Sequence, residues 1–310
     1  MIPTYEPGPY LVEALRGILA QDPGEAVMQI AIVDDASPTV DVAAMVATVA
    51  PAGRVEIHRN PTNLGLAGNW NRGIELARGE LVHLLHQDDL ILPGFYEQLL
   101  RGFAAEPQVG MAFSRHAFMD ETGRWTRRSH RERWRRGKLG RWLARISQRQ
   151  RIQFPAAIVR RAVYERLGGF RSDLAFALDW EMWVRIAAAY PVWYEPRILA
   201  CYRRHLGSET TRLGRAGSIG TDTLRAIEVF SQHLPEQVRD RLRIGAYQRL
   251  IHVQLRHAGK LLARRHVASA REQLEIARTS VQRLPAGLAR VLCDRQLRRM
   301  ERRCAACEDS

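Results

Sequence analysis

Two adjacent carboxylates, Asp88 and Asp89, follow the apolar run Leu81–Leu85 at a distance of two residues. Such a run is typical of a buried strand, and open α/β sheets bind ligands at the carboxyl ends of their strands. Because neighbouring Asp side chains repel each other and are costly to desolvate, they require a cation or strong hydrogen-bond donors. A hard divalent cation that carries a phosphate meets this requirement. The alternative is a turn that caps a helix beginning near Pro93.

Polar side chains also follow three other predicted strands. Because the carboxyl ends of parallel strands lie at one edge of a sheet, we expect all four groups to line a single crevice. Any one group also fits a turn or a helix cap, so the prediction depends on their order and spacing together. The groups are Pro3-Thr4-Tyr5, Asp34-Asp35-Ala36-Ser37, the loop from Asn63 through Gly65 and Asn69 to Asn71, and His86-Gln87-Asp88-Asp89.

Strands and helices are predicted to alternate through the first part of the chain. Short apolar runs that alternate with helices of about ten residues predict βαβ units and a parallel sheet. The first strand is short for such a sheet, which predicts further apolar residues before Ile2, lost through a truncation or a start placed too far downstream. The expected strands span 1–3, 29–33, 55–58, 81–85 and 109–114, and the expected helices span 9–21, 42–49, 69–78 and 93–105.

The rest of the chain is predicted to be mixed up to about residue 202 and helical beyond it. A strand and a helix are expected over 154–169, a helix over 179–190 and a strand over 198–202. Between 218 and 303, apolar residues recur at helical spacing, which predicts packed helices rather than a cofactor site.

Composition limits the class of protein. The 310 residues suffice for one large domain or for one domain with appendages, and the 46% of hydrophobic residues suffice for a sizeable core. No apolar run reaches the ~18–20 residues that span a bilayer, and no secretory signal is evident. The four cysteines form no disulfide pattern, which predicts a reducing cytoplasm. Cys304 and Cys307 lack a second ligand pair, so two helix cysteines are expected rather than a zinc site.

The net charge of +14 is concentrated in one segment. Residues 124–151 contain eleven Arg and one Lys against the single acidic Glu132, a net charge of +11, with Trp125, Trp134 and Trp142 interspersed. This composition suits an anionic surface, whether lipid headgroups, a polyphosphate or nucleic acid. The alternative is a solvated basic helix or loop with no specific partner.

Residues 1–210 resemble family 2 glycosyltransferases of the GT-A fold. The resemblance rests on IPTY at the start, VDDAS, NLGLAGNWNRGIELARGE, HQDD, LGGF, DWEMW and the Tyr202–His205 run YRRH. It implies an α/β fold with a Rossmann-like, mostly parallel sheet flanked by helices. The implied organisation is a nucleotide-binding half (1–115), a basic acceptor-side segment (116–152), an acceptor and catalytic half (153–210) and a helical C-terminal region (211–310).

The resemblance also implies site residues and a cofactor. Asp179 would be the general base that deprotonates the acceptor hydroxyl, and Asp88 and His205 would hold Mg²⁺ or Mn²⁺ at the diphosphate of the donor. The alternatives are that Asp179 caps the following helix and that His205 is a polar residue without a metal. The implied nucleotide-binding residues are Pro3, Tyr5, Asp34, Asp35, Asn63, Gly65, Asn69 and Asp88.

Three positions depart from the family pattern. His86 replaces the first acid of the Asp-x-Asp motif, Leu178 replaces the acid before Asp179, and Glu6 replaces the Asn that commonly follows the tyrosine. We interpret the first two as marks of a subfamily. They also support a competing hypothesis, a catalytically inactive glycosyltransferase-like scaffold.

The expected function is therefore inverting transfer of a sugar from a UDP-, GDP- or dTDP-sugar to a glycan or lipid-linked acceptor, in polysaccharide biosynthesis at the cell envelope. We expect a cytoplasmic protein, with residues 124–151 attaching it peripherally to an anionic membrane at the inner face of the plasma membrane. A nucleic-acid-binding protein is disfavoured because it leaves Asp88, Asp179 and the βαβ pattern unexplained. A dinucleotide-binding enzyme is disfavoured because the first βα turn lacks G-x-G-x-x-G.

Overall fold

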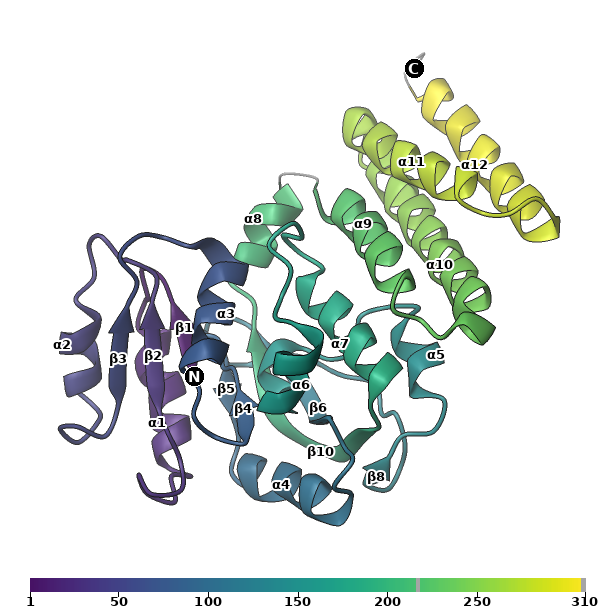
Figure 1. The fold of residues 1–310 in the computed structure, drawn as a ribbon. Coiled ribbons are helices and arrows are strands. Elements are labelled where there is room, and N and C mark those ends of the chain that lie inside the picture. Colours follow the sequence, from purple (N-terminus) through teal and green to yellow (C-terminus); the bar gives the residue numbers. More distant parts are fainter. Residues whose placement is uncertain (216–217, 308–310) are drawn as a thin grey trace. The chain divides into compact units, whose positions relative to one another are not determined.

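The computed structural model describes residues 1–215 and 218–307 (Figure 1). Within them the chain forms two compact units that interleave along the sequence, so the chain passes between the units several times. The predicted boundary at residue 210 stays a prediction. The first unit comprises Met1–Trp142, Arg151–Asp173 and Ala189–Leu206, and the second comprises Leu143–Gln150, Leu174–Ala188 and the chain from Gly207 onward.

Three parallel strands form the first sheet of the first unit, in the order β1-β2-β3. Ile2 pairs with Ile32, and Val33 pairs with His58. Every residue of the central strand is buried, which explains its uninterrupted apolar run. The carboxyl ends of the three strands therefore lie at one edge, as predicted. The strands are β1 (Ile2–Thr4), β2 (Ala31–Asp34) and β3 (Glu56–Arg59).

The helices that accompany these strands each bury apolar residues. In the first of them, Leu11, Ala14, Leu15 and Ile18 recur at a spacing of three to four residues and are all buried. They join the core that also contains Ile2 and other residues of the first unit. The helices are α1 (Tyr10–Leu19), α2 (Val42–Ala47) and α3 (Gly65–Leu76).

The second sheet of the first unit has seven strands. Its main path is β4-β9-β6-β10-β5, with β7 paired to β6 and β8 paired to β10. Among the described strands of this sheet, only β6 and β10 pair in parallel. The strands are β4 (Leu81–His83), β5 (Leu90–Ile91), β6 (Met111–Met119), β7 (Trp125–Arg128), β8 (Gly137–Lys138), β9 (Ala157–Arg160) and β10 (Val192–Arg203).

Two hydrogen bonds join the sheets beside the candidate site. The Met1 amino group donates to the His83 carbonyl at 2.9 Å, and the Leu85 N–H donates to the Met1 carbonyl at 3.0 Å. The start of β1 thus lies alongside the end of β4, and the polar groups that follow these strands share one edge.

Four α-helices and a short 3-10 helix complete the α/β part of the chain. The long helix α7 is buried on most sides, which agrees with its run of apolar residues. These helices are α4 (Phe95–Ala105), α5 (Trp142–Ile146), the 3-10 helix η1 (Phe154–Ala156), α6 (Arg161–Leu167) and α7 (Leu178–Ala189).

The C-terminal region is helical, as predicted. Figure 1 shows α10, α11 and α12 packed side by side, and the buried stripe of the longest helix includes Leu242, Ala246 and Leu250. No helix within 1–215 or 218–307 is both long enough and apolar enough to cross a membrane. The helices are α8 (Glu209–Arg215), α9 (Ile219–Ser231), α10 (Glu236–Leu262), α11 (Val267–Gln282) and α12 (Leu288–Ala306).

The α/β fold class is confirmed, and three elements differ from their predicted bounds by four residues or more at one end. Helix α3 begins at Gly65, four residues before the predicted start at Asn69, where Asp35 and Asn63 accept the N–H groups at its start. Strand β10 begins at Val192 rather than Ile198, and its register shifts around Pro196, which has no N–H to donate. Strand β6 extends to Met119 because its second half pairs with β7.

Candidate active site

The carboxyl end of β4 brings three potential metal ligands together. His86, Asp88 and Asp89 each offer a ligand atom, and these atoms lie within 4.8 Å of one another. The run of apolar residues in and after β4 is buried, and the chain turns immediately after it, since the Asp89 N–H donates to the His86 carbonyl at 3.2 Å. The turn therefore presents this cluster at the edge where the predicted crevice lies.

Asp88 is the solvent-accessible carboxylate of the cluster. Its Oδ2 lies 2.9 Å from Nε2 of His205, and the two side chains are 22% and 20% exposed. His205 follows β10 and packs beside the Tyr10 ring, with centroids 5.4 Å apart. The structure thus brings together the two residues predicted to hold a metal.

Asp89, unlike Asp88, is fully buried, and its carboxylate is held by the backbone of Arg203. One carboxylate oxygen accepts the Arg203 N–H at 2.8 Å, and the other has no hydrogen-bond partner. The Arg203 guanidinium donates to the Asp88 carbonyl at 2.9 Å and to the Glu13 carboxylate at 2.6 Å, and it lies 4.1 Å from the Tyr10 ring centroid. Burial, followed by the charge of Asp88, raises the pKa of Asp89 well above its usual range.

His86 lies in an aromatic cluster. Its ring stacks on Phe154 at 4.2 Å and lies 4.8 Å from Trp70. Burial lowers the pKa of His86 to about 4, so the imidazole is neutral at physiological pH and can act as a ligand. Its Nε2 is buried and has no hydrogen-bond partner.

The cluster fits a divalent cation. Buried polar atoms are normally paired, so the Asp89 Oδ2, which has no hydrogen bond and lies 3.7 Å from Nδ1 of His86, indicates that the site needs a further partner. The available donors are carboxylate oxygens and imidazole nitrogens. Imidazole is an unusual ligand for Mg²⁺ and a common one for transition metals, so this set suits Mn²⁺ better than Mg²⁺.

The end of β1 is tied to the end of β4 by Gln87. The Gln87 Oε1 accepts hydrogen bonds from the Thr4 hydroxyl and from the Tyr5 N–H, the latter at 2.9 Å, and its Nε2 donates to the Tyr5 carbonyl at 3.2 Å. The Tyr5 ring is 46% exposed and free to face a ligand. Pro3 is buried within β1.

Glu6 stabilises the loop after β2. Its backbone is in the left-handed region, with φ at 44°. Its carboxylate accepts hydrogen bonds from the hydroxyl and N–H of Thr39 and from the Val40 N–H, and the Thr39 contacts lower the pKa of Glu6. The residue that departs from the family pattern here has a structural role.

Asp34 and Asp35, which end β2, are both buried and hydrogen-bonded. Asp34 accepts from the hydroxyl and N–H of Ser37 and pairs with Arg59. Asp35 accepts from the Asn60 amide and the Leu64 N–H, each at 2.8 Å, and from the Gly65 N–H at 3.0 Å. Both carboxylates therefore shape the surrounding loops.

The loop before α3 is held by two asparagines. Asn63 lies on the surface, and its side-chain oxygen accepts the Gly65 N–H at 3.0 Å, where the backbone of Gly65 has φ at 73° and favours glycine. Asn69 is buried, accepts from Asn60 at 3.0 Å and donates to the Val33 carbonyl at 3.0 Å. Of these residues, Asn63 and Gly65 are exposed, whereas Asn69 is buried.

Asp179 lies in the first turn of α7, within the second unit. Its carboxylate accepts from the Gln150 amide and from the Trp180 N–H, each at 2.6 Å. Burial is the largest influence on this carboxyl, and the charge of Asp222 adds to it, so the pKa of Asp179 is raised to about 7. A carboxylate with this pKa can accept a proton at neutral pH.

The loop that leads into α7 is held by Asp222 of α9. Its carboxylate accepts the N–H groups of Ala175, Phe176 and Ala177 at 2.7–3.0 Å.

The sequence patterns predicted no role for four residues that the structure places at these positions: Asp222, Gln87, Gln150 and Arg203. Gln87 lies within the HQDD motif and Arg203 within the YRRH motif, so their membership of these motifs was the signal that could have identified them. Asp222 and Gln150 have no signal in sequence, because each acts on residues at least 29 positions away.

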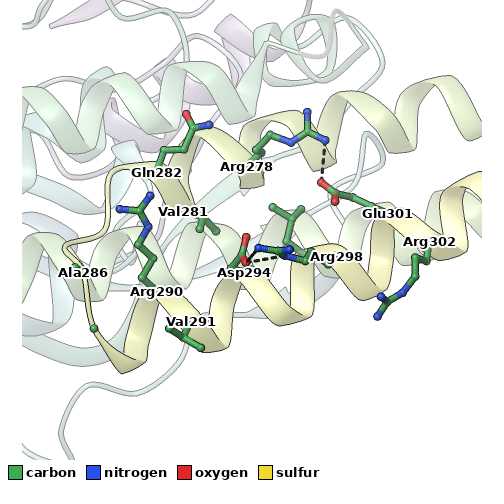
Figure 2. A pocket seen from close by; sticks show the side chains of 12 residues that line it. Arg278, Val281, Gln282, Ala286, Arg290, Val291, Asp294, Arg298, Glu301 and Arg302 are labelled. Atoms are coloured by element: carbon green, nitrogen blue, oxygen red, sulfur yellow. Dashed lines mark hydrogen bonds and ion pairs between the residues drawn. The ribbon is translucent and has the colours of Figure 1, made fainter.

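Figure 2 shows a different hollow, of about 860 Å³, on α11 and α12. Its charged side chains largely satisfy one another. Arg278 pairs with Glu301 at 2.9 Å, and Arg298 pairs with Asp294 at 2.6 Å. None of the predicted site residues lines this hollow.

Comparisons with known proteins identify the family of this chain. Residues 1–168 match the family described as Glycosyl transferase family 2. The uncharacterised protein MT1568 of Mycobacterium tuberculosis is 34% identical over 223 residues, which cover 68% of each chain. The uncharacterised glycosyltransferase MJ1057 of Methanocaldococcus jannaschii is 22% identical over 135 residues, 44% of this chain and 45% of its own.

Solved structures show the same fold. TarS residues 1–349 of S. aureus, in complex with UDP-GlcNAc, has a TM-score of 0.68 at 17% identity and covers 92% of this chain and 80% of that chain. The mannosyltransferase PcManGT from Pyrobaculum calidifontis, in complex with GDP-Man and Mn²⁺, has a TM-score of 0.59 at 21% identity, with coverage of 99% and 84%. The fold is that of the GT-A glycosyltransferases. This chain belongs to glycosyl transferase family 2 and is a glycosyltransferase.

Proposed function

We propose that this protein is an inverting, metal-dependent glycosyltransferase that moves a sugar from a UDP-, GDP- or dTDP-sugar to a glycan or lipid-linked acceptor. The observation that carries the proposal is the pairing of Asp88 with His205 beside His86 and Asp89 at the end of β4. This cluster combines accessible carboxylate, neutral imidazole and unpartnered buried atoms, which is the chemistry expected of a cation site that receives a diphosphate.

Asp88 and His205 would hold the cation, with His86 and Asp89 as further donors. When bound, Mn²⁺ or Mg²⁺ supplies Lewis-acid stabilisation of the charge on the departing nucleoside diphosphate. Arg203 positions the ligands, since it fixes the Asp88 carbonyl and one Asp89 oxygen. The complex of PcManGT with GDP-Man and Mn²⁺ supports a cation of this kind.

The nucleotide would lie over the carboxyl ends of β1 and β2. The exposed Tyr5 ring offers a stacking surface for the base, and Asn63 and Gly65 border the same edge. Pro3, which is buried in β1, and the hydrogen-bonded Asp34, Asp35 and Asn69 would shape this surface. The complexes of TarS with UDP-GlcNAc and with UDP support a nucleotide ligand for this fold.

Asp179 would act as the general base on the acceptor hydroxyl. Its raised pKa of about 7 matches the base to neutral pH, and its hydrogen bonds to Gln150 and Trp180 fix the direction of the carboxylate. Removal of the acceptor proton as the donor bond breaks gives a single displacement with inversion at the anomeric carbon. The proposed setting is polysaccharide biosynthesis on the cytoplasmic side of the cell envelope.

Calorimetric titration tests the proposal. UDP, GDP and dTDP are titrated into the protein with Mn²⁺, with Mg²⁺ and without metal, and into Asp88→Asn. Micromolar binding of one diphosphate that requires metal and falls at least ~100-fold in Asp88→Asn is expected. The matched control is Asp240→Asn, an exposed carboxylate on α10 paired only with Arg243 among the described residues, which should bind as the wild type does.

Failure of all three diphosphates to bind would overturn the proposal. The replacement of family acids by His86 and Leu178 would then favour a catalytically inactive scaffold. Binding that is independent of metal and unaffected in Asp88→Asn would remove Asp88 from the site while retaining a nucleotide-dependent transferase.

A further inference from the structure

The strand β7 and the loop after it form a cationic surface, in which the single acidic residue, Glu132, pairs with Arg151. We call it the Arg–Trp surface. Its seven arginines are all exposed, and none of them forms an ion pair with a carboxylate among the described residues. The surface consists of Trp125, Trp134 and the arginines Arg127, Arg128, Arg131, Arg133, Arg135, Arg136 and Arg141.

Both tryptophans of this surface are exposed, and Trp125 also makes a side-chain hydrogen bond to Cys201. Trp134 is 82% exposed and Trp125 is 42% exposed, whereas the other five tryptophans of the chain are buried. Exposure of a large aromatic side chain withholds a substantial hydrophobic gain, so these two residues need an explanation that the other tryptophans do not. Arg131 lies 4.3 Å from the Trp134 ring centroid, and Arg128 lies 5.7 Å from the Trp125 ring centroid.

Contacts with the rest of the first unit hold the loop that carries Trp134 in place. The Leu139 N–H donates to the Val192 carbonyl at 2.9 Å, and the Glu132 N–H donates to the Tyr194 hydroxyl at 3.1 Å. At the end of the segment, Trp142 is buried against Phe113, with centroids 5.1 Å apart. These contacts hold the loop at both ends while Trp134 remains in solvent.

We infer that the Arg–Trp surface docks the protein on a bilayer that contains anionic lipids. Guanidinium groups bind lipid phosphates, and indole rings favour the level of the headgroups. The charge of the surface complements an anionic leaflet, which attracts basic segments over a Debye length. This inference is independent of the proposed catalytic chemistry, because it uses none of the residues of the candidate active site.

The indole contacts favour a membrane over a nucleic acid. Single-stranded nucleic acids bind by stacking bases on open aromatic faces. One face of Trp134 is already covered by Arg131, which leaves an indole suited to insertion beside phosphates rather than to base stacking on both faces. Nucleic-acid binding in place of lipid binding is an outcome of the test below.

The two exposed tryptophans provide an intrinsic reporter. The full-length protein is mixed with vesicles of phosphatidylcholine and phosphatidylglycerol, and separately with phosphatidylcholine alone. We expect anionic vesicles to shift tryptophan emission to the blue and to lower acrylamide quenching. Phosphatidylcholine alone and duplex or single-stranded DNA should produce neither change. Raised salt should weaken the binding.

Co-sedimentation with the same vesicles tests the residues. The double variant Trp125→Ala, Trp134→Ala and the triple variant Arg128→Glu, Arg131→Glu, Arg135→Glu are each expected to lose at least ~10-fold in partitioning. The matched control reverses three exposed arginines of α12, Arg295→Glu, Arg299→Glu and Arg303→Glu, and so removes the same net charge from another place. It should retain most of the binding.

Equal loss in the α12 control would overturn the inference, because overall charge rather than this surface would then drive binding. Equal binding to neutral vesicles, or an emission shift produced only by DNA, would also overturn it. Circular dichroism and binding of the nucleoside diphosphate verify that each variant is folded. A variant that binds nucleotide but not vesicles separates this inference from the proposed transferase activity.

Discussion

Asp88 and Asp179, the two carboxylates proposed for catalysis, differ in their exposure to solvent. Asp88 is accessible and paired with His205, which suits a metal ligand at the edge of the site. Asp179 is desolvated, and its pKa is raised to about 7, which suits a group that must gain and lose a proton. The chemistry therefore depends on burial as much as on residue type.

Asp179→Asn is expected to raise stability and lower activity. Folding raises the pKa of Asp179 from 3.8 to about 7, so the folded protein retains a proton that the unfolded chain releases between these values. The contribution of this carboxyl to stability is thus greatest below pH ~4 and falls as the pH rises towards 7. At pH 8 the variant should gain on the order of 2–4 kcal/mol in the free energy of unfolding.

Urea unfolding of the wild type and of Asp179→Asn at pH 4 and pH 8 tests the sign of this effect. The gain should vanish at pH 4, where both proteins are neutral at this position. In the wild type, kcat/KM should rise with pH around a midpoint near 7, and in the variant kcat should fall by about 100-fold or more. A variant that is less stable at pH 8 would contradict the assigned pKa.

At the scale of elements, the start of α7 is positioned by a side chain from α9. Asp222 accepts three consecutive N–H groups just before Asp179, and its charge adds to the raised pKa of Asp179. Asp222→Ala is expected to cost about 1–3 kcal/mol in the free energy of unfolding, since it leaves these groups without their partner. It should also lower kcat while leaving nucleotide affinity unchanged.

The pH profile separates positioning from simple loss of structure. Removal of the Asp222 charge should move the midpoint of kcat/KM against pH to a lower value, because that charge raises the pKa of Asp179. Asp222→Asn retains one acceptor oxygen and should recover part of the stability with the same shift in the pH profile. An unchanged midpoint in both variants would argue against this electrostatic link.

Helix α4 is packed too closely on β10 to admit a methyl group. A Cβ at Gly102 would lie 2.5 Å from the Trp193 ring, whereas a Cβ at Gly17 in α1 would meet nothing closer than 3.4 Å. Gly102→Ala is expected to lower the free energy of unfolding by about 1–3 kcal/mol. Gly17→Ala, the matched helical control, should be neutral or raise it by up to ~1 kcal/mol. Chemical denaturation measures both, and equal effects would refute the packing argument.

At the scale of the whole molecule, the two units interleave along the sequence, so a single cut in the chain does not separate them. Trp180 of α7 packs edge-on against Phe230 of α9, with centroids 5.0 Å apart, and Asp222 holds the preceding loop. A fragment of residues 1–210 would therefore expose Trp180 and leave the N–H groups of Ala175, Phe176 and Ala177 without the Asp222 carboxylate. We expect this fragment to lose cooperative thermal unfolding, measured by circular dichroism.

The control fragment, residues 1–286, ends before α12 and keeps α9 intact. It should unfold cooperatively with a lower Tm, because it loses only the packing of α12 on its neighbours. Cooperative folding of residues 1–210 alone would instead support the predicted domain boundary at residue 210.

Much of the fold could be predicted because strand and helix periodicity is local. The apolar run before Asp34 and Asp35, the run before His86 and the stripe of α1 each reveal an element from within a few residues. The direction of pairing in the second sheet could not be predicted in this way, because β4, β9 and β6 come from distant segments and join antiparallel. Their partners are chosen by packing across the whole unit.

By itself, the sequence determined which residue types end each strand, the concentration of charge in residues 124–151 and the family resemblance, since these features need only order and spacing. The tertiary structure decided that Asp89 is buried while Asp88 is accessible, and that Arg203 anchors both, from 114 and 115 positions away. It also decided which tryptophans of the basic segment face solvent. Burial and long-range hydrogen bonds arise only when distant segments pack together, so local patterns do not encode them.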